Sequence, residues 1–175
     1  GERQELRVTK NPGRPTKGSR PPLAPKTGRP GKASEVDDPY NMYFSPHGKS
    51  AIVVAEALKR LDFRDPVTMK LQYSIPTPQC GGINHADFSI DGAYVIFTCE
   101  FSKGLAKIDL VNRKVIAYLK LSKGGMPQDI RVSPDGSKFY VADMHADGVF
   151  VIDGVSFRET GFINVGKGTH GTYPS

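Results

Sequence analysis

The chain has 175 residues, 38% of them hydrophobic, which allows one or two domains with a core. It contains no run of about twenty apolar residues of the kind that crosses a membrane as a helix. The formal net charge of +6 is uneven, because residues 1–32 hold nine Lys or Arg against two Glu, whereas residues 33–175 hold 15 basic and 16 acidic residues. The basic balance of the whole chain is therefore no argument for nucleic-acid binding.

The first segment, residues 1–25, is rich in Pro, Gly, Arg and Lys and holds almost no aromatic or β-branched residues. Such a segment cannot bury enough apolar area to offset the entropy of ordering, so we predict a disordered basic arm. Its basic residues are spread out, with no aromatic ring interleaved to stack on bases, which favours a solvated tail over a nucleic-acid or lipid-binding arm. The polar start contains no signal peptide, although a chain starting with Gly1 rather than Met leaves room for a missing upstream portion.

The remainder, residues 26–175, consists of short β-prone runs joined by turns. Residues 26–36 resemble the end of a four-stranded unit. The first complete unit spans about residues 38–75, with strands predicted at Tyr40–Ser45, Ala51–Ala55, Leu58–Phe63 and Met69–Ile75. A second unit spans about residues 83–121, with its second strand at Tyr94–Cys99.

The third unit, about residues 127–165, shows the pattern most clearly. Its strands are predicted at Asp129–Ser133, Lys138–Ala142, Val149–Ile152 and Glu159–Val165. A Pro-Asp-Gly turn joins the first two, because Pro presets φ, Asp bonds to its own backbone and Gly adopts positive φ. Four short strands joined by such turns form an antiparallel meander. Residues 167–175 are expected to begin a fourth unit.

The three units share one register. Turn glycines recur every 44 residues, as do the aspartates that open the later turn: Gly48, Gly92 and Gly136; Asp65, Asp109 and Asp153. A 44-residue period of four strands predicts an all-β fold made of β-propeller blades. Closed propellers need about four to eight blades, so three blades with a partial blade at each end predict an incomplete ring, a piece of a larger propeller.

Strand direction sorts the loops of such a meander onto two faces. The loops between second and third strands and the blade-to-blade connections share one face, which we call the loop face. The innermost strands converge on a central channel, where ligand sites usually form. The rim of this channel is predicted to include Asn41, Asn84, His85, Gln128, Asp129 and His170, with His145 nearby.

One specific hypothesis is a metal site at the channel mouth, with His85 and His170 as ligands. Imidazole and carboxylate groups suit a transition metal such as Zn, Cu or Fe. No two of the rim residues have a diagnostic ligand spacing, which favours the plainer interpretation that they hydrogen-bond strand ends. No cofactor is therefore predicted, and a transition metal remains the alternative.

Cys80 and Cys99 are the only cysteines. Pairing about the Asp91-Gly92 turn puts Cys99 opposite roughly Asn84, and a Gly-Gly pair after Cys80 allows the chain to fold back. A disulfide, which implies an oxidising compartment, and two free thiols both remain open.

The motifs Ser133-Pro134-Asp135-Gly136 and Tyr140-Val141-Ala142-Asp143 resemble those of the YVTN-type bacterial β-propeller family, and the chain from Asp37 onward is similar to actinobacterial members. The resemblance implies a seven-bladed fold and an exported protein, secreted or in the cell envelope. Relatives by fold include lactonases, a haem domain and quinoprotein subunits, but none of their active-site motifs matches here. No catalytic residue is therefore assigned, and no serine-nucleophile or phosphate-loop motif occurs.

Two functions follow from these patterns. The first is a non-enzymatic binding or scaffold propeller that presents a protein or small-molecule ligand site on the loop face and central channel. The alternative is a propeller enzyme or subunit that binds a metal, haem or quinone. In either case the open blade edges predict a chain that alone is poorly stable, aggregates, or self-associates by pairing with a second copy.

Overall fold

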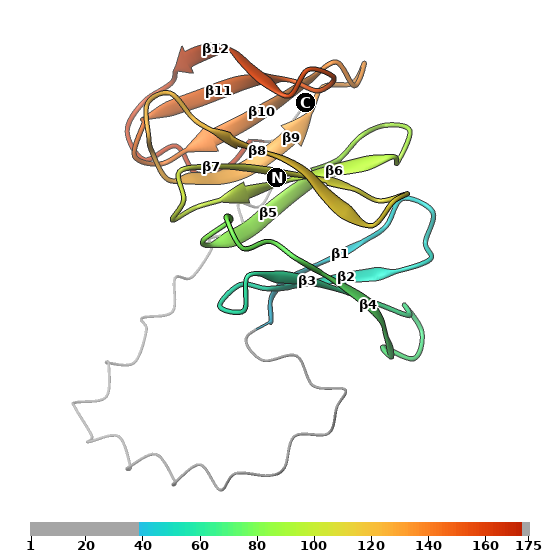
Figure 1. The fold of residues 1–175 in the computed structure, drawn as a ribbon. Coiled ribbons are helices and arrows are strands. Elements are labelled where there is room, and N and C mark those ends of the chain that lie inside the picture. The colour runs from blue at the N-terminus through green and yellow to red at the C-terminus, as the bar shows by residue number, and fades with distance from the viewer. Residues whose placement is uncertain (1–38, 173–175) are drawn as a thin grey trace, which may run out of the picture. The chain divides into compact units, whose positions relative to one another are not determined.

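The computed structural model describes residues 39–172, which fold into twelve strands arranged as three four-stranded sheets (Figure 1). The first sheet contains β1 (Pro39–Phe44), β2 (Ala51–Ala55), β3 (Arg60–Arg64) and β4 (Leu71–Pro76). The second contains β5 (Ile83–Phe88), β6 (Tyr94–Cys99), β7 (Gly104–Asp109) and β8 (Lys114–Lys120). The third contains β9 (Pro127–Val132), β10 (Lys138–Asp143), β11 (Gly148–Asp153) and β12 (Arg158–Asn164).

Each sheet is an antiparallel meander in which strands pair in chain order, so the all-β fold of β-propeller blades is confirmed. Two predicted strands, Ala51–Ala55 and Tyr94–Cys99, have the observed bounds, and the others differ by at most two residues at an end. The arm at residues 1–25 and the blade end at 26–36 lie outside the described residues. Residues 165–172 contain no strand, so a fourth blade beginning near residue 167 stays a prediction.

The first turn of each blade has the same geometry. The N–H of the turn glycine donates to a serine carbonyl three residues earlier, at 2.8, 2.9 and 2.9 Å in the three copies. All three glycines adopt positive φ, between 66° and 74° in Gly48, Gly92 and Gly136. His47, which replaces the turn aspartate in the first blade, keeps this geometry. A Cβ at these positions would strain the turn, which explains the glycine spacing.

The turn between third and fourth strands depends on an aspartate. Asp65, Asp109 and Asp153 each accept a hydrogen bond from the backbone N–H three residues later, at 2.7, 2.8 and 2.8 Å. The carboxylate thus replaces a backbone acceptor inside the turn, as is typical of Asx turns. The 44-residue spacing of these aspartates therefore reflects one repeated local structure.

A second periodicity lies in backbone conformation. The non-glycine residues with positive φ in the described part of the chain fall into two sets spaced by 44 residues: Lys59, Lys103 and Asp147; Met69, Arg113 and Phe157. The first set ends the turn between second and third strands, and its carbonyls accept hydrogen bonds from the following connections. These bonds run from Thr77, Leu121 and Val165 at 2.7, 3.1 and 3.4 Å.

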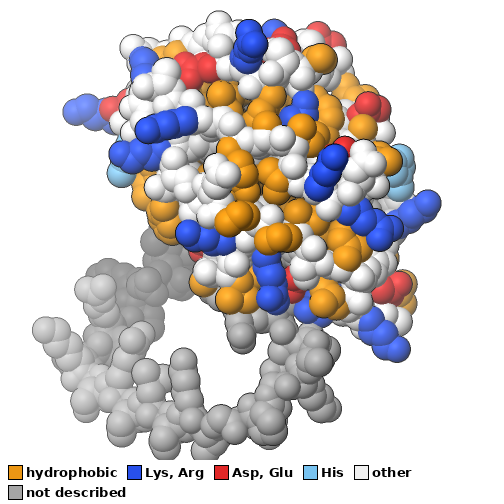
Figure 2. Space-filling view, in the orientation of Figure 1, with side chains coloured by type: hydrophobic (Ala, Val, Ile, Leu, Met, Phe, Trp, Pro, Cys, Tyr) orange, Lys and Arg blue, Asp and Glu red, His pale blue; other side chains and the backbone are white. Residues whose placement is uncertain are grey.

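Two apolar cores lie between consecutive sheets. The first joins sheets one and two around Phe63 and Phe97, and the second joins sheets two and three around Phe139 and Phe150. These four rings are at most 1% exposed. Burial of each large apolar side chain contributes about 1.5–3 kcal/mol, so face-to-face packing of sheets is the main source of stability. The outer surface mixes hydrophobic with Lys and Arg side chains (Figure 2).

A disulfide joins Cys80, in the connection before β5, to Cys99 at the end of β6, with their Cα atoms 4.9 Å apart. Both cysteines are buried in the first core. The expected register was wrong by one residue, since Cys99 pairs with Ile83 and a bulge between Ile83 and Ala86 displaces Asn84. Gly82 adopts positive φ and makes the expected reversal. No helix among the described residues is long and apolar enough to cross a membrane.

We expect reduction of this disulfide to lower the free energy of unfolding by about 3 kcal/mol, since it closes a loop with a sequence separation of 19 residues. Urea unfolding with and without reductant measures the change, and a Cys80→Ala/Cys99→Ala variant should match the reduced protein. Identical unfolding midpoints in all three samples would contradict a structural disulfide.

Candidate functional site

The strands β1, β5 and β9 are each the first strand of a sheet and lie at its edge, and we call them the inner strands. The middle one, β5, contacts both β1 and β9. The repeat places equivalent residues beside one another on these strands. Asn41, His85 and Asp129 occupy one position, and Tyr40, Asn84 and Gln128 occupy the position before it. Five of the residues predicted for the channel rim thus lie, together with Tyr40, in two short rows across these strands, which we call the rim cluster, whereas His170 lies after β12.

His85 is half-buried near the centre of this cluster. The ring of Tyr40 meets it edge-on with ring centroids 6.3 Å apart. Burial lowers the pKa of His85 below its usual 6.5, the charge of Asp129 opposes this shift, and the charges of Arg131 and His170 add to it. This shift favours the neutral imidazole, which can donate from one nitrogen and accept at the other.

Asp129 on β9 links this strand to the segment after β12. Its Oδ1 forms an ion pair with Arg131 Nη1 at 2.8 Å, and its Oδ2 accepts the Thr172 N–H at 2.9 Å. The second contact folds the segment after β12 back toward β9. This segment carries His170, whose charge contributes a small part of the downward shift in the pKa of His85.

Two buried amides in the rim cluster have unused hydrogen-bonding capacity. Asn84 Nδ2 donates to Glu100 Oε2 at 2.9 Å, but Asn84 Oδ1 has no partner. Gln128 Nε2 also has none within the described part of the chain. The two residues are 0% and 5% exposed. Asn84 Oδ1 is thus an acceptor and Gln128 Nε2 a donor without a partner, at equivalent positions of β5 and β9. Buried polar atoms without partners are uncommon in folded proteins, so this pair requires an explanation.

Thr98 on β6 holds the inner strands behind these amides. Its buried hydroxyl accepts the His85 N–H at 3.0 Å and lies 3.3 Å from the carbonyl oxygens of His85 and Gln128. One side chain therefore links the second sheet to the third beside the rim cluster. Sequence reasoning missed this residue because a threonine in a strand is ordinarily a packing residue.

The other predicted rim residues have local roles. Asn41 donates through Nδ2 to the Tyr43 hydroxyl at 2.8 Å. His145 is exposed between β10 and β11, where its N–H donates to Asp143 Oδ1 at 3.1 Å. Sequence reasoning also missed Thr172, although the spacing from Gln128 is again 44 residues and could have identified it.

The described residues provide no complete ligand set for the metal site that the sequence suggested. Among residues 39–172 no group of three or more His, Cys, Asp and Glu side chains is arranged to hold a metal ion. A metal at this rim therefore stays a hypothesis.

The three-sheet fold is similar to solved β-propeller structures. Hydrazine synthase from Kuenenia stuttgartiensis matches with a TM-score of 0.70 and 22% identity, over 83% of this chain and 41% of that chain. A proposed 6-phosphogluconolactonase from Bacteroides uniformis matches with a TM-score of 0.64 and 17% identity, over 74% of this chain and 42% of that chain. The chain thus spans under half the length of these structures, and the likeness establishes the fold alone.

No protein-family model matches the sequence, and no curated protein matches it. The resemblance to the YVTN-type family therefore stays a prediction.

We expect the His85 ring to titrate below the usual pKa of 6.5, because burial disfavours its charged form. This depressed pKa stabilises the fold above pH 6.5, and the contribution falls as the pH drops through the folded pKa. NMR titration of the imidazole signals measures it, with the signal assigned by its loss in a His85→Gln variant. A measured pKa at or above 6.5 would show that the ring is hydrated or paired with an anion.

Proposed function

We propose that this chain is a non-enzymatic binding propeller whose rim cluster recognises a polar ligand group. The observation that carries the proposal is the pair of buried, unpartnered amide atoms, Asn84 Oδ1 and Gln128 Nε2. Leaving such atoms unpaired costs about 1–3 kcal/mol each. Both atoms are buried, so a ligand with one donor and one acceptor offsets this cost once neighbouring side chains move aside. A peptide amide has this donor and acceptor pair, so a protein or peptide partner fits best.

The neutral state of His85 supports this choice over a charged ligand. Its neighbours carry both signs, with Asp129 and Arg131 paired to each other at 2.8 Å. A charged ligand would find no unpaired countercharge in this pair, whereas a neutral amide requires none. The buried disulfide supports an oxidising, extracytoplasmic location, which is the localisation that the family resemblance implies.

The cofactor-binding alternative rests on the two histidines predicted as ligands, His85 and His170, of which the second affects the pKa of the first. Metal analysis and an absorption spectrum of the purified protein distinguish the two functions. A stoichiometric transition metal or a haem or quinone band would replace the binding proposal with the alternative.

A Gln128→Met variant tests whether the unpaired amide serves binding. We expect its free energy of unfolding to stay equal or rise by up to about 1 kcal/mol, since an unpaired buried donor is replaced by an apolar group of similar shape. The comparison variant is Gln72→Met, whose amide is exposed but bonds both Ser50 Oγ at 2.6 Å and Lys49 O at 3.0 Å, and which should lose about 0.5–1 kcal/mol. Urea unfolding gives both values.

Binding itself is measured with N-acetylglycine N-methylamide as a probe of the peptide amide. Millimolar probe should shift the Asn84 and Gln128 side-chain NMR signals in the unaltered protein and leave the Gln128→Met variant unaffected at this site. The proposal fails if Gln128→Met destabilises as much as Gln72→Met, or if the probe shifts neither amide.

The open face of the third sheet supports self-association as well. Tyr140, Val149 and Ile163 occupy the positions at which Ile96, Leu105 and Leu119 of the second sheet pack against the third. Ile163 is 47% exposed, whereas its equivalent in the first sheet, Ile75, is 2% exposed. We propose that a second copy covers this face, since an apolar sheet face of this kind is buried wherever a further sheet follows.

An Ile163→Asp variant should weaken this association at least tenfold, because burying an unpaired carboxylate opposes contact. Sedimentation over a range of concentrations measures it, with Val155→Asp as control because Val155 is 86% exposed in the turn after β11. An unaltered chain that stays monomeric at every concentration would rule out the second copy.

A further inference from the structure

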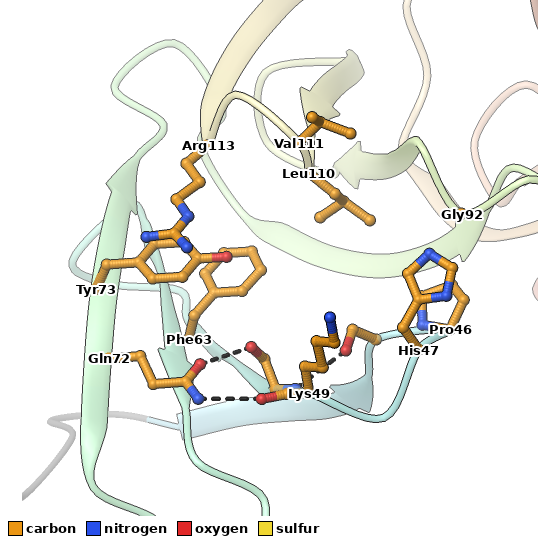
Figure 3. Close-up of a pocket in the computed structure, with 12 residues that line it drawn as sticks. Pro46, His47, Lys49, Phe63, Gln72, Tyr73, Gly92, Leu110, Val111 and Arg113 are labelled. Carbon is orange, nitrogen blue, oxygen red and sulfur yellow. Dashed lines mark hydrogen bonds between the residues drawn. The ribbon is translucent and has the colours of Figure 1, made fainter.

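A cavity of about 480 Å³ opens between the first and second sheets at the end opposite the loop face (Figure 3). The first sheet contributes Phe63, Tyr73 and the β1–β2 turn, and the second contributes Leu110, Val111 and Arg113. A space of this size holds a small organic molecule. The cavity is remote in the fold from the rim cluster, because the β1–β2 and β7–β8 turns lie at the other end of the strands.

The apolar part of the cavity is rigid. Phe63 and Tyr73 stack with ring centroids 4.4 Å apart and planes 13° from parallel. Phe63 is buried, and Leu110 of the second sheet packs against the same core, while Val111 lies at the exposed rim of the cavity. Stacked rings lose little further entropy when a ligand contacts them, so this wall is preorganised for an apolar group.

The charged part of the cavity is cationic. Arg113 places its guanidinium carbon 4.4 Å from the Tyr73 ring centroid, and Lys49 extends from the β1–β2 turn on the other side (Figure 3). The lining contains no Asp or Glu, and neither cation forms an ion pair within residues 39–172. A guanidinium held against a ring in this way offers a planar fork that suits a carboxylate.

The one amide in the lining is already used. Gln72 accepts the Ser50 hydroxyl and donates to the Lys49 carbonyl, contacts that fix the wall below the rings (Figure 3). Its polar atoms are therefore unavailable to a ligand. Arg113 and Lys49 provide the cationic donors beside the apolar wall, and His47 and Tyr73 add further polar groups to the lining.

The equivalent place between the second and third sheets is filled. The repeat puts Tyr94 at the position of Ser50 and Lys107 at that of Phe63. The Tyr94 hydroxyl and Lys107 Nζ both donate to the Gly154 carbonyl, at 2.9 and 2.8 Å, and Nζ lies 3.9 Å from the Tyr94 ring centroid. The cavity between the first two sheets therefore arises from these substitutions and is no general consequence of stacking blades.

We propose that this cavity is a second ligand site, which binds a small organic carboxylate with an apolar ring. The carboxylate pairs with Arg113 and Lys49, and the ring packs against Phe63, Tyr73 and Leu110. This site is independent of the rim cluster and of the function proposed for it.

Indole-3-acetate is a suitable probe, because the chain contains no Trp and the indole fluorescence is free of protein background. We expect saturable binding with a Kd of about 0.1–1 mM, measured by fluorescence anisotropy. Arg113→Gln should weaken binding at least tenfold, and Lys114→Gln, an exposed neighbour outside the cavity, should change it by less than about twofold. The neutral analogue indole-3-acetamide should bind at least tenfold more weakly than the acid.

A Ser50→Tyr variant copies the residue that fills the equivalent place and should abolish binding, with its fold checked by circular dichroism. Gln128→Met should bind the probe normally, which separates this site from the rim cluster. Full binding by the Arg113→Gln variant, equal binding of acid and amide, or absence of saturable binding to the unaltered chain would each overturn the proposal.

Discussion

The burial of one sheet face against the next is the interaction on which the rest of this structure depends. Each sheet has four short strands, and a lone meander of this kind cannot bury its apolar side chains. Phe63 and Phe97 fill the first contact, and Phe139 and Phe150 fill the second. Because every contact uses the same repeat positions, strand length, turn type and register must stay constant, and the 44-residue period follows from this requirement.

This constraint explains why so much of the fold could be predicted. Gly48 and Asp65 mark turns whose chemistry admits few other residues, so their recurrence reveals the meander. The left-handed conformations of Lys59 and Met69 were beyond prediction, since neither residue type favours positive φ. The bulge after Ile83 was missed for a similar reason, because tertiary packing decides where a strand gains a residue.

The candidate sites occur where equivalent positions depart from the apolar pattern. At the rim, the predicted His85 and Asp129 lie on adjacent strands, but the unpaired state of Gln128 could be recognised only once its surroundings were known. The cavity beside Phe63 could not be predicted, since it depends on a small Ser50 that the sequence does not distinguish from any turn serine. Both sites thus combine a fixed scaffold with a local change of side chain.

Hydrogen exchange measured residue by residue tests the central claim of stacked, mutually supporting sheets most directly. The middle sheet packs on both faces, whereas the first and third each pack against it on one face. The account predicts that amides of β6 and β7 exchange most slowly, at rates set by the global free energy of unfolding, and that the flanking sheets open earlier. Slowest exchange in β2 or β11, or equal protection in all three sheets, would contradict it.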